Sequence, residues 1–87
     1  MKAEIKNSEA LGLILQQGRL RQGLTQKQLA DELGIRQAYI WQMESGKPTK
    51  YADRLFELLR ATGIKLIADL EDEPTLRKFP NGENKRT

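Results

Sequence analysis

The sequence predicts a mainly α fold of four to five helices that ends in one C-terminal β-strand. Two observations support this prediction. Apolar residues recur three or four positions apart along most of residues 8–62, as they do on one face of a helix. The period then changes to two, and the residues that alternate in this last segment are Ile64, Leu66, Ala68 and Leu70. We therefore expect a small helical domain with a single strand after its last helix.

The composition excludes several classes of protein. The chain has 87 residues, which allows one domain with a modest core and only marginal stability as a monomer. It has no cysteine and no histidine, so disulfides, thiolate zinc ligands, thiol catalysis and the usual general base are missing. A net charge of +3 permits nucleic-acid binding without establishing it. With no signal peptide and no apolar run that could span a membrane, we expect a cytoplasmic protein, not an enzyme, without cofactor or metal.

Residues 25–44 indicate two short helices joined by a tight turn. Thr25 is a good N-cap, and Gln28 follows at the spacing of a capping box, so a helix should begin here. Gly34 can adopt the positive φ that ends this helix. Apolar residues then recur at helical spacing, which predicts a second helix over about residues 36–44. Two helices joined in this way form a helix-turn-helix, whose second helix can enter a DNA major groove.

The second of these helices has an outward face that folding does not need. Arg36 stands at its N-terminal end, where a cation opposes the helix dipole at a cost of about 0.3–1 kcal/mol. An anionic partner explains this choice, because arginine offers a bidentate fork to phosphate or guanine. Glutamine can likewise bond adenine N6 and N7 together, and an alanine methyl can contact thymine. The predicted base-reading residues are Arg36, Gln37, Ala38, Tyr39 and Gln42, with ordinary exposed surface residues as the alternative.

The segment TQKQLADELGIRQAYIWQMESGKP resembles the Cro/C1-type (Xre-like) helix-turn-helix. It has the pattern T-Q-x-x-L-A-x-x-x-G-I, an isoleucine inside the second helix and a glutamate that ends this helix before G-K. The longer frame, with ALGLILQQGRLRQGLTQ before the motif and GIKLIADL after it, is similar to HipB-type antitoxins. These are small dimeric repressors that accompany a HipA-type kinase toxin. The resemblance covers roughly residues 9–70 and implies a lambda-repressor-like domain that binds operator DNA as a homodimer.

In the family that this segment resembles, the start of the first motif helix lies against the DNA backbone. Helix N-termini suit that role because their free N–H groups and dipole favour anions. For Arg19 the alternative is a salt bridge with Glu44, and for Lys47 it is simple solvation. The residues predicted to contact phosphates are Thr25, Gln26, Arg19 and Lys47.

Trp41 departs from the family pattern, which usually has a small or polar residue at this position. An exposed indole is common at interfaces and costly to leave uncovered. It could contact thymine methyls or sugars, pack on Tyr39 or Arg54, or meet a neighbouring protein. We therefore treat Trp41 as a candidate interface residue and leave these alternatives open.

Two further helices are expected to flank the motif. Ser8 can cap a helix over about residues 9–22, and Gly18 inside it predicts that another helix packs closely there. Thr49 can cap a helix over about residues 50–62, whose broad apolar face should close the core as a lid. Both helices are followed by a glycine, as helix ends commonly are.

The C-terminal strand lacks an obvious partner in its own chain. A lone strand leaves backbone N–H and C=O groups unpaired, so pairing with the same strand of a second copy about a two-fold axis is the least demanding solution. HipB-type antitoxins are similar in having such an intersubunit sheet. The alternatives are a frayed extension or a hairpin with residues 3–6. Three segments result, namely a flexible arm (1–7), a DNA-binding and dimerisation domain (8–70) and a flexible tail (71–87).

The leading functional interpretation is a sequence-specific repressor that binds inverted-repeat operator DNA as a homodimer. The resemblance implies that it is the antitoxin of a HipBA-like operon and also binds a HipA-type kinase toxin. Two alternatives remain open. The chain could be an interaction module that mainly binds a kinase toxin and binds DNA weakly, or a phage-type or stand-alone Xre regulator.

Overall fold

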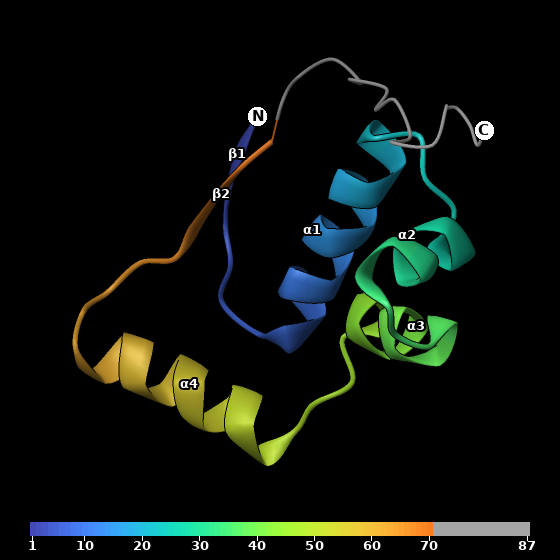
Figure 1. Cartoon of the computed structure of the whole chain (residues 1–87). Coiled ribbons are helices and arrows are strands. Elements are labelled where there is room, and N and C mark those ends of the chain that lie inside the picture. Colours follow the sequence, from blue (N-terminus) through green and yellow to red (C-terminus); the bar gives the residue numbers. More distant parts are fainter. Residues whose placement is uncertain (71–87) are drawn as a thin grey trace.

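The computed structural model describes residues 1–70 and confirms the mainly α fold, with four helices and a small two-stranded sheet (Figure 1). The elements in chain order are β1 (Lys2–Glu4), α1 (Ser8–Arg21), α2 (Gln26–Leu33), α3 (Gln37–Ser45), α4 (Lys50–Ala61) and β2 (Ile67–Asp69). The tail that was predicted to be flexible, residues 71–87, lies outside the described residues. Within residues 1–70, no helix combines the length and the apolar composition of a membrane span.

Local capping sets the starts of the helices. The Thr25 side chain accepts from the backbone N–H of Gln28 at 3.0 Å, and the Gln28 side chain accepts from the N–H of Thr25 at 2.9 Å. This capping box satisfies two donors that the first turn of α2 would otherwise leave open. Thr49 caps α4 as predicted, whereas α1 is capped by Asn7 and not by Ser8. Both predictions for the threonine caps are confirmed.

Helices α1, α2 and α3 pack together as one body. α1 and α3 come closest at Gly12, where an added Cβ would lie 2.7 Å from the Met43 carbonyl oxygen, closer than any side chain could be placed. Around Gly18 nothing lies within 4 Å, so the prediction of close packing at that glycine is wrong. Leu24, Ala30 and Ile40 are the buried apolar side chains of this body. We call it the helical body below.

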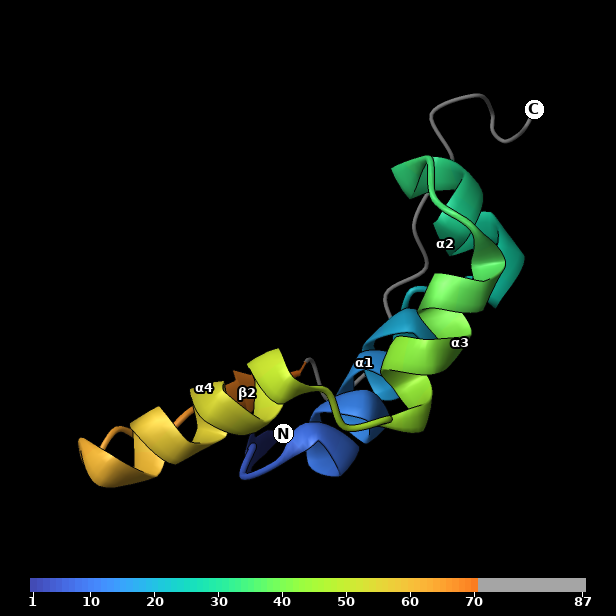
Figure 2. The same ribbon diagram turned by 90° about the horizontal axis from the view of Figure 1, so that it is seen from below.

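Helix α4 does not close this core, and the prediction that it forms a lid is wrong. It stands apart from the helical body in both views (Figures 1 and 2) and has only marginal contacts with it. Its one buried side chain, Phe56, instead borders a hollow of about 270 Å³ together with residues from the strand side, including Ile5 and Leu66. Phe56 and Ile5 therefore face the same hollow, and α4 lies on the strand side of the molecule.

The two strands pair with each other inside one chain. β1 and β2 run antiparallel with Ala3 opposite Ala68, and the backbone N–H of Ile5 donates to the Leu66 carbonyl at 2.8 Å beyond them. The prediction of a loose N-terminal arm is wrong for Lys2–Glu4. The reason for expecting a sheet across a dimer was the lack of a partner in the chain, and that reason is wrong too. The open alternative, a pairing near residues 3–6, is what the structure contains, and β2 is shorter than the predicted strand 64–70.

Candidate nucleic-acid interface

Helix α3 is attached to the helical body on one side and is exposed on the other. Ile40 is buried and anchors its inner side, and Gly34 closes α2 in front of it at φ 70°. Arg36 is the N-cap residue, and its side chain makes no capping hydrogen bond. The structure leaves all the predicted base-reading residues and Trp41 exposed: Arg36, Gln37, Ala38, Tyr39, Trp41 and Gln42.

These exposed residues do not all point the same way. Ala38, Trp41 and Gln42 share one outward stripe of α3, because positions i, i+3 and i+4 of a helix lie on the same side. Gln37 borders this stripe one turn before Trp41. We call these four residues the outer face of α3. Tyr39 lies on the flank of the helix, about 100° from Ala38 around the axis.

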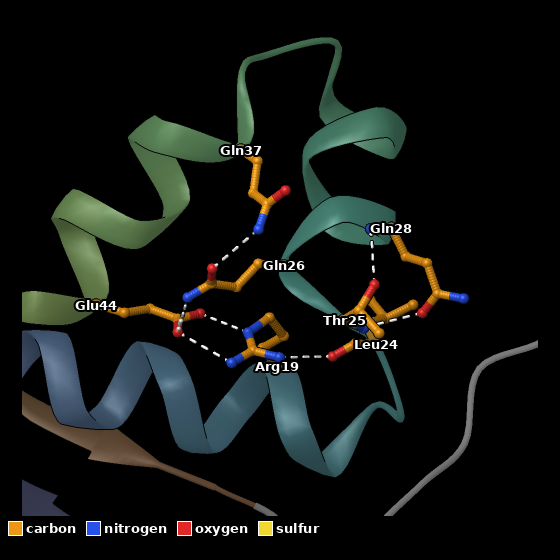
Figure 3. Close-up of polar contacts among 7 residues, drawn as sticks. All are labelled: Arg19, Leu24, Thr25, Gln26, Gln28, Gln37 and Glu44. Atoms are coloured by element: carbon orange, nitrogen blue, oxygen red, sulfur yellow. Dashed lines mark hydrogen bonds and ion pairs between the residues drawn. The ribbon is translucent and has the colours of Figure 1, made fainter.

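An ion pair between Arg19 on α1 and Glu44 on α3 fixes the inner side of α3 (Figure 3). The Nε of Arg19 donates to one carboxylate oxygen of Glu44, and its Nη2 donates to the other at 3.0 Å. Its Nη1 donates to the backbone carbonyl of Leu24 at 2.8 Å. The two side chains are only 8% and 6% exposed. The pair therefore joins α1, α3 and the turn before α2.

This geometry corrects the phosphate contact predicted for Arg19. Each of its three nitrogens donates one hydrogen bond inside the protein, and its side chain is nearly covered, so its guanidinium is directed into the protein and not toward a DNA backbone. The alternative left open by the sequence, a salt bridge with Glu44, is confirmed. Hydrogen bonding from Arg19 lowers the pKa of Glu44 against the opposing effect of burial, and the same contact raises the pKa of Arg19.

A chain of side-chain hydrogen bonds leads from this ion pair to the outer face of α3 (Figure 3). Glu44 also accepts from the amide Nε2 of Gln26 at 3.1 Å, and the Oε1 of Gln26 accepts from the Nε2 of Gln37 at 3.3 Å. A carboxylate can only accept, so Gln26 must turn its NH₂ group toward Glu44 and its carbonyl oxygen toward Gln37. Gln37 must then donate, which leaves its own Oε1 and its second amide hydrogen facing away from the protein.

The remaining predicted phosphate contacts lie near the ends of α2 and α3. Thr25 is exposed, and its hydroxyl oxygen accepts from Gln28 in the capping box, so its hydroxyl hydrogen is still available to donate. Gln26 is half-buried and has one amide hydrogen left after its bond to Glu44. Lys47 follows Gly46 after α3 and is exposed, with no ion pair to another residue of the described part. These three contacts with DNA stay predictions.

The sequence analysis missed the part that Glu44 plays. It noted Glu44 only as the last residue of a helix, and as one of two possible partners for Arg19. A signal was present, because Glu44 follows the buried Ile40 by four residues and so lies on the same side of α3, toward the helical body. Among residues 1–70, no three acidic, cysteine or histidine side chains gather in a way that could hold a metal ion.

Comparison with known proteins gives one match. A family model described as helix-turn-helix matches residues 15–68, which is more than half of the chain. The match includes α2, the turn and α3, together with the second half of α1 and all of α4. No curated protein and no solved structure matches the chain significantly.

Proposed function

The chain belongs to the Cro/C1-type helix-turn-helix family, and on this basis we propose that this DNA-binding transcription regulator is a sequence-specific repressor. It binds an inverted-repeat operator as a homodimer, with α3 of each copy in a major groove. One observation carries the proposal. The inner side of α3 is fixed by Glu44 and Ile40, while its outer face is exposed, and the side-chain hydrogen bond that the structure gives it within residues 1–70 is that of Gln37 to Gln26.

The orientation of Gln37 suits adenine better than guanine. Adenine presents a donor at N6 and an acceptor at N7, whereas guanine presents two acceptors, O6 and N7. The bond to Gln26 leaves Gln37 with one acceptor and one donor, which match the adenine edge. Gln42 can add a second base contact, and the methyl of Ala38 can meet a thymine. Arg36, at the start of α3, makes no capping hydrogen bond, and within residues 1–70 its guanidinium fork is available for guanine or phosphate.

The phosphate contacts in this proposal come from the edge of the unit. Lys47 supplies a cation just after α3 that has no ion pair within residues 1–70. Thr25 and Gln26 supply donors at the N-terminus of α2, where the dipole also favours an anion. These contacts hold the protein in register on the duplex without reading its sequence. The same geometry in two copies would set half-sites one helical turn apart, or a multiple of it.

We further propose that the repressor is the antitoxin of a HipBA-like operon and that it also binds a HipA-type kinase toxin. The similarity of the sequence frame on both sides of the motif supports this, and a cytoplasmic location would follow from it. The alternative, an interaction module with weak DNA binding, is favoured by the exposure of Trp41, which is 59% exposed in the middle of the outer face. A stand-alone Xre regulator is the third possibility.

A binding assay with the DNA upstream of the protein's own gene tests the proposal. Gel-shift titrations at several salt concentrations should give a retarded species whose affinity falls as salt rises. Gln37→Ala should weaken binding by a factor that corresponds to about 1–3 kcal/mol at one base pair of each half-site. Asp31→Ala, on the exposed side of α2, is the matched control and should leave affinity unchanged. The lack of any shift at low salt would reject the repressor function.

The antitoxin role needs a separate experiment. Co-expression with the product of the neighbouring gene, followed by affinity purification through a tag on one of the two proteins, should recover both together. Purification of Trp41→Ala in the same way distinguishes the alternatives. If the variant loses the second protein but still binds DNA, Trp41 serves the toxin and not the operator. If no kinase gene lies next to this one, the antitoxin role is rejected while DNA binding stands.

A further inference from the structure

The hydrogen bonds around Glu44 connect the interior of the protein with an exposed side chain on the outer face of α3 (Figure 3). At the inner end, the side chains of Arg19 and Glu44 are only 8% and 6% exposed. Gln26 is half-buried in the middle, and Gln37 is exposed at the outer end. A pair of buried charges is therefore linked, through one glutamine, to a side chain that is predicted to contact a base.

The direction of these hydrogen bonds is fixed at the inner end. Two nitrogens of the Arg19 guanidinium donate to the carboxylate of Glu44, and this contact keeps the carboxylate ionised at neutral pH by lowering its pKa. An ionised carboxylate can only accept. Gln26 therefore meets Glu44 with its NH₂ group, at 3.1 Å. The carbonyl oxygen of Gln26 is left to accept from the amide of Gln37, at 3.3 Å.

This direction determines what Gln37 offers to a base. One amide hydrogen is used by Gln26, so the carbonyl oxygen and one hydrogen of Gln37 remain. Adenine, with a donor at N6 and an acceptor at N7, matches that pair, whereas guanine would bring an acceptor against the carbonyl oxygen. If Gln37 instead accepted from Gln26, both of its amide hydrogens would be available for the two acceptors of guanine. The orientation of Gln26 therefore controls this distinction.

We propose that Glu44 is a positioning residue for base recognition, which acts through Gln26 to hold the amide of Gln37 in the orientation that selects adenine over guanine. This inference rests on the proposed DNA-binding function and deepens it. Glu44 lies on the inner side of α3 and is nearly covered, so it acts on base selectivity without touching DNA.

The test measures selectivity separately from overall affinity. The probe is the DNA upstream of the protein's own gene, in which each A·T pair of a protected half-site is replaced in turn by G·C. Fluorescence anisotropy then gives a ratio of affinities for adenine and guanine at each position. The base pair that Gln37 contacts is the one at which Gln37→Ala abolishes the ratio. There we expect the wild type to prefer adenine roughly 5-fold to 150-fold, as a bidentate contact does.

Gln26→Met removes the connecting amide and leaves the buried ion pair in place. The adenine preference at that position should fall below about threefold, because the amide of Gln37 is then free to turn either way. Lys47→Ala is the comparison, since it should weaken binding to both sequences by the same factor and keep the ratio. Asp31→Ala should alter neither. If Gln26→Met also lowers both affinities equally, Gln26 serves only as a backbone contact and the proposal is overturned.

An exchange of the two polar groups tests Glu44 itself. Glu44→Gln places a group that can also donate at the inner end, so Gln26 is free to turn around and the adenine preference should fall. Adding Gln26→Glu moves the carboxylate one step outward, where it can only accept from Gln37. The double variant should regain the adenine preference, although a second negative charge near the phosphates lowers its affinity for every sequence. A purely structural role of Glu44 predicts no such recovery.

The outcomes distinguish this inference from the proposed function. If the wild type binds no DNA, both are overturned. If it binds DNA but Glu44→Gln keeps the wild-type ratio, or the double variant does not regain it, the positioning role is overturned and DNA binding stands. Circular dichroism at the assay temperature shows whether Glu44→Gln is folded. If it is not, Gln26→Met decides, because the hydrogen bonds of the Gln26 side chain within residues 1–70 are those to Glu44 and Gln37.

Discussion

At the scale of single residues, Glu44 has more consequences than any base-reading side chain. Glu44→Ala would leave the guanidinium of Arg19 buried without its counter-charge and would remove the acceptor that orients Gln26. Breaking a buried pair in this way typically costs about 3–5 kcal/mol, most of the stability of so small a domain. Urea denaturation followed by circular dichroism measures the loss. We expect a large fall in the midpoint of unfolding.

The chain contains a matched control for this prediction. Lys27 and Asp31 form an ion pair at 2.9 Å on the exposed side of α2, with side chains 73% and 67% exposed. Exposed pairs at i and i+4 contribute about 0.3–0.5 kcal/mol, so Asp31→Ala should hardly move the midpoint. If Glu44→Ala and Asp31→Ala lower stability by similar amounts, the buried pair does not hold α3 on α1 as described.

The lowered pKa of Glu44 also makes the stability of the protein depend on pH. The pKa of Glu44 in the folded protein is lowered from its ordinary value of 4.5 by the hydrogen bond from Arg19. A carboxylate whose pKa is lower in the folded than in the unfolded protein stabilises the fold. This stabilisation is fully present at a pH above the pKa of the unfolded state and is lost as the pH falls through the pKa of the folded state. The free energy of unfolding should therefore decline below about pH 4.5, the unfolded reference. Glu44→Gln should show a shallower decline, and parallel curves for the two proteins would contradict the assignment.

At the scale of single elements, α3 can be observed directly, because Trp41 is the only tryptophan of the chain. If the outer face of α3 enters a major groove, operator DNA should change the intensity and the emission maximum of Trp41 fluorescence as water is excluded from the indole. Unrelated DNA at the same salt should give a smaller change. Binding that is visible by gel shift but leaves the emission unaltered would place Trp41 outside the DNA interface.

The elements also show what a sequence can predict. Thr25 and Thr49 cap their helices, and Gly34 ends α2, because caps depend on a few neighbouring residues whose types are visible in the chain. Gly12 and Gly18 lie in the same helix, and only the distant chain at Met43 determines which of them is crowded. The exposed face of α3 was predicted from helical spacing. For Arg19, the sequence left a phosphate and Glu44 as possible partners, and the choice between them depends on how α1 packs against α3.

At the scale of the whole molecule, the errors of the sequence analysis share one cause. The partners of α4 and of the C-terminal strand were predicted from the period of their apolar residues, and this period does not tell which distant segments of the chain lie close in space. Phe56 and Ile5, which are far apart in the sequence, line the same hollow, so α4 sits on the strand side and not on the helical body. β2 likewise pairs with Lys2–Glu4, from the other end of the chain. Such long-range pairings depend on the packing of the entire fold and not on the local period of apolar residues.

The whole assembly also determines how binding to DNA responds to salt. Each phosphate contact adds a slope of about −0.9 to the plot of log affinity against log salt concentration. A homodimer carries every such contact twice, so Lys47→Ala should make this slope shallower by about two units, whereas a monomer on a single half-site would lose about one. Fluorescence anisotropy with labelled operator between about 50 and 200 mM salt measures the difference.

The control for this measurement is Lys27→Ala, which removes an exposed lysine that is paired with Asp31. Arg19→Lys does not serve as a control, because Arg19 is buried. Lys27→Ala should leave the slope nearly unaltered, and a slope for Lys47→Ala equal to that of the wild type would remove Lys47 from the interface.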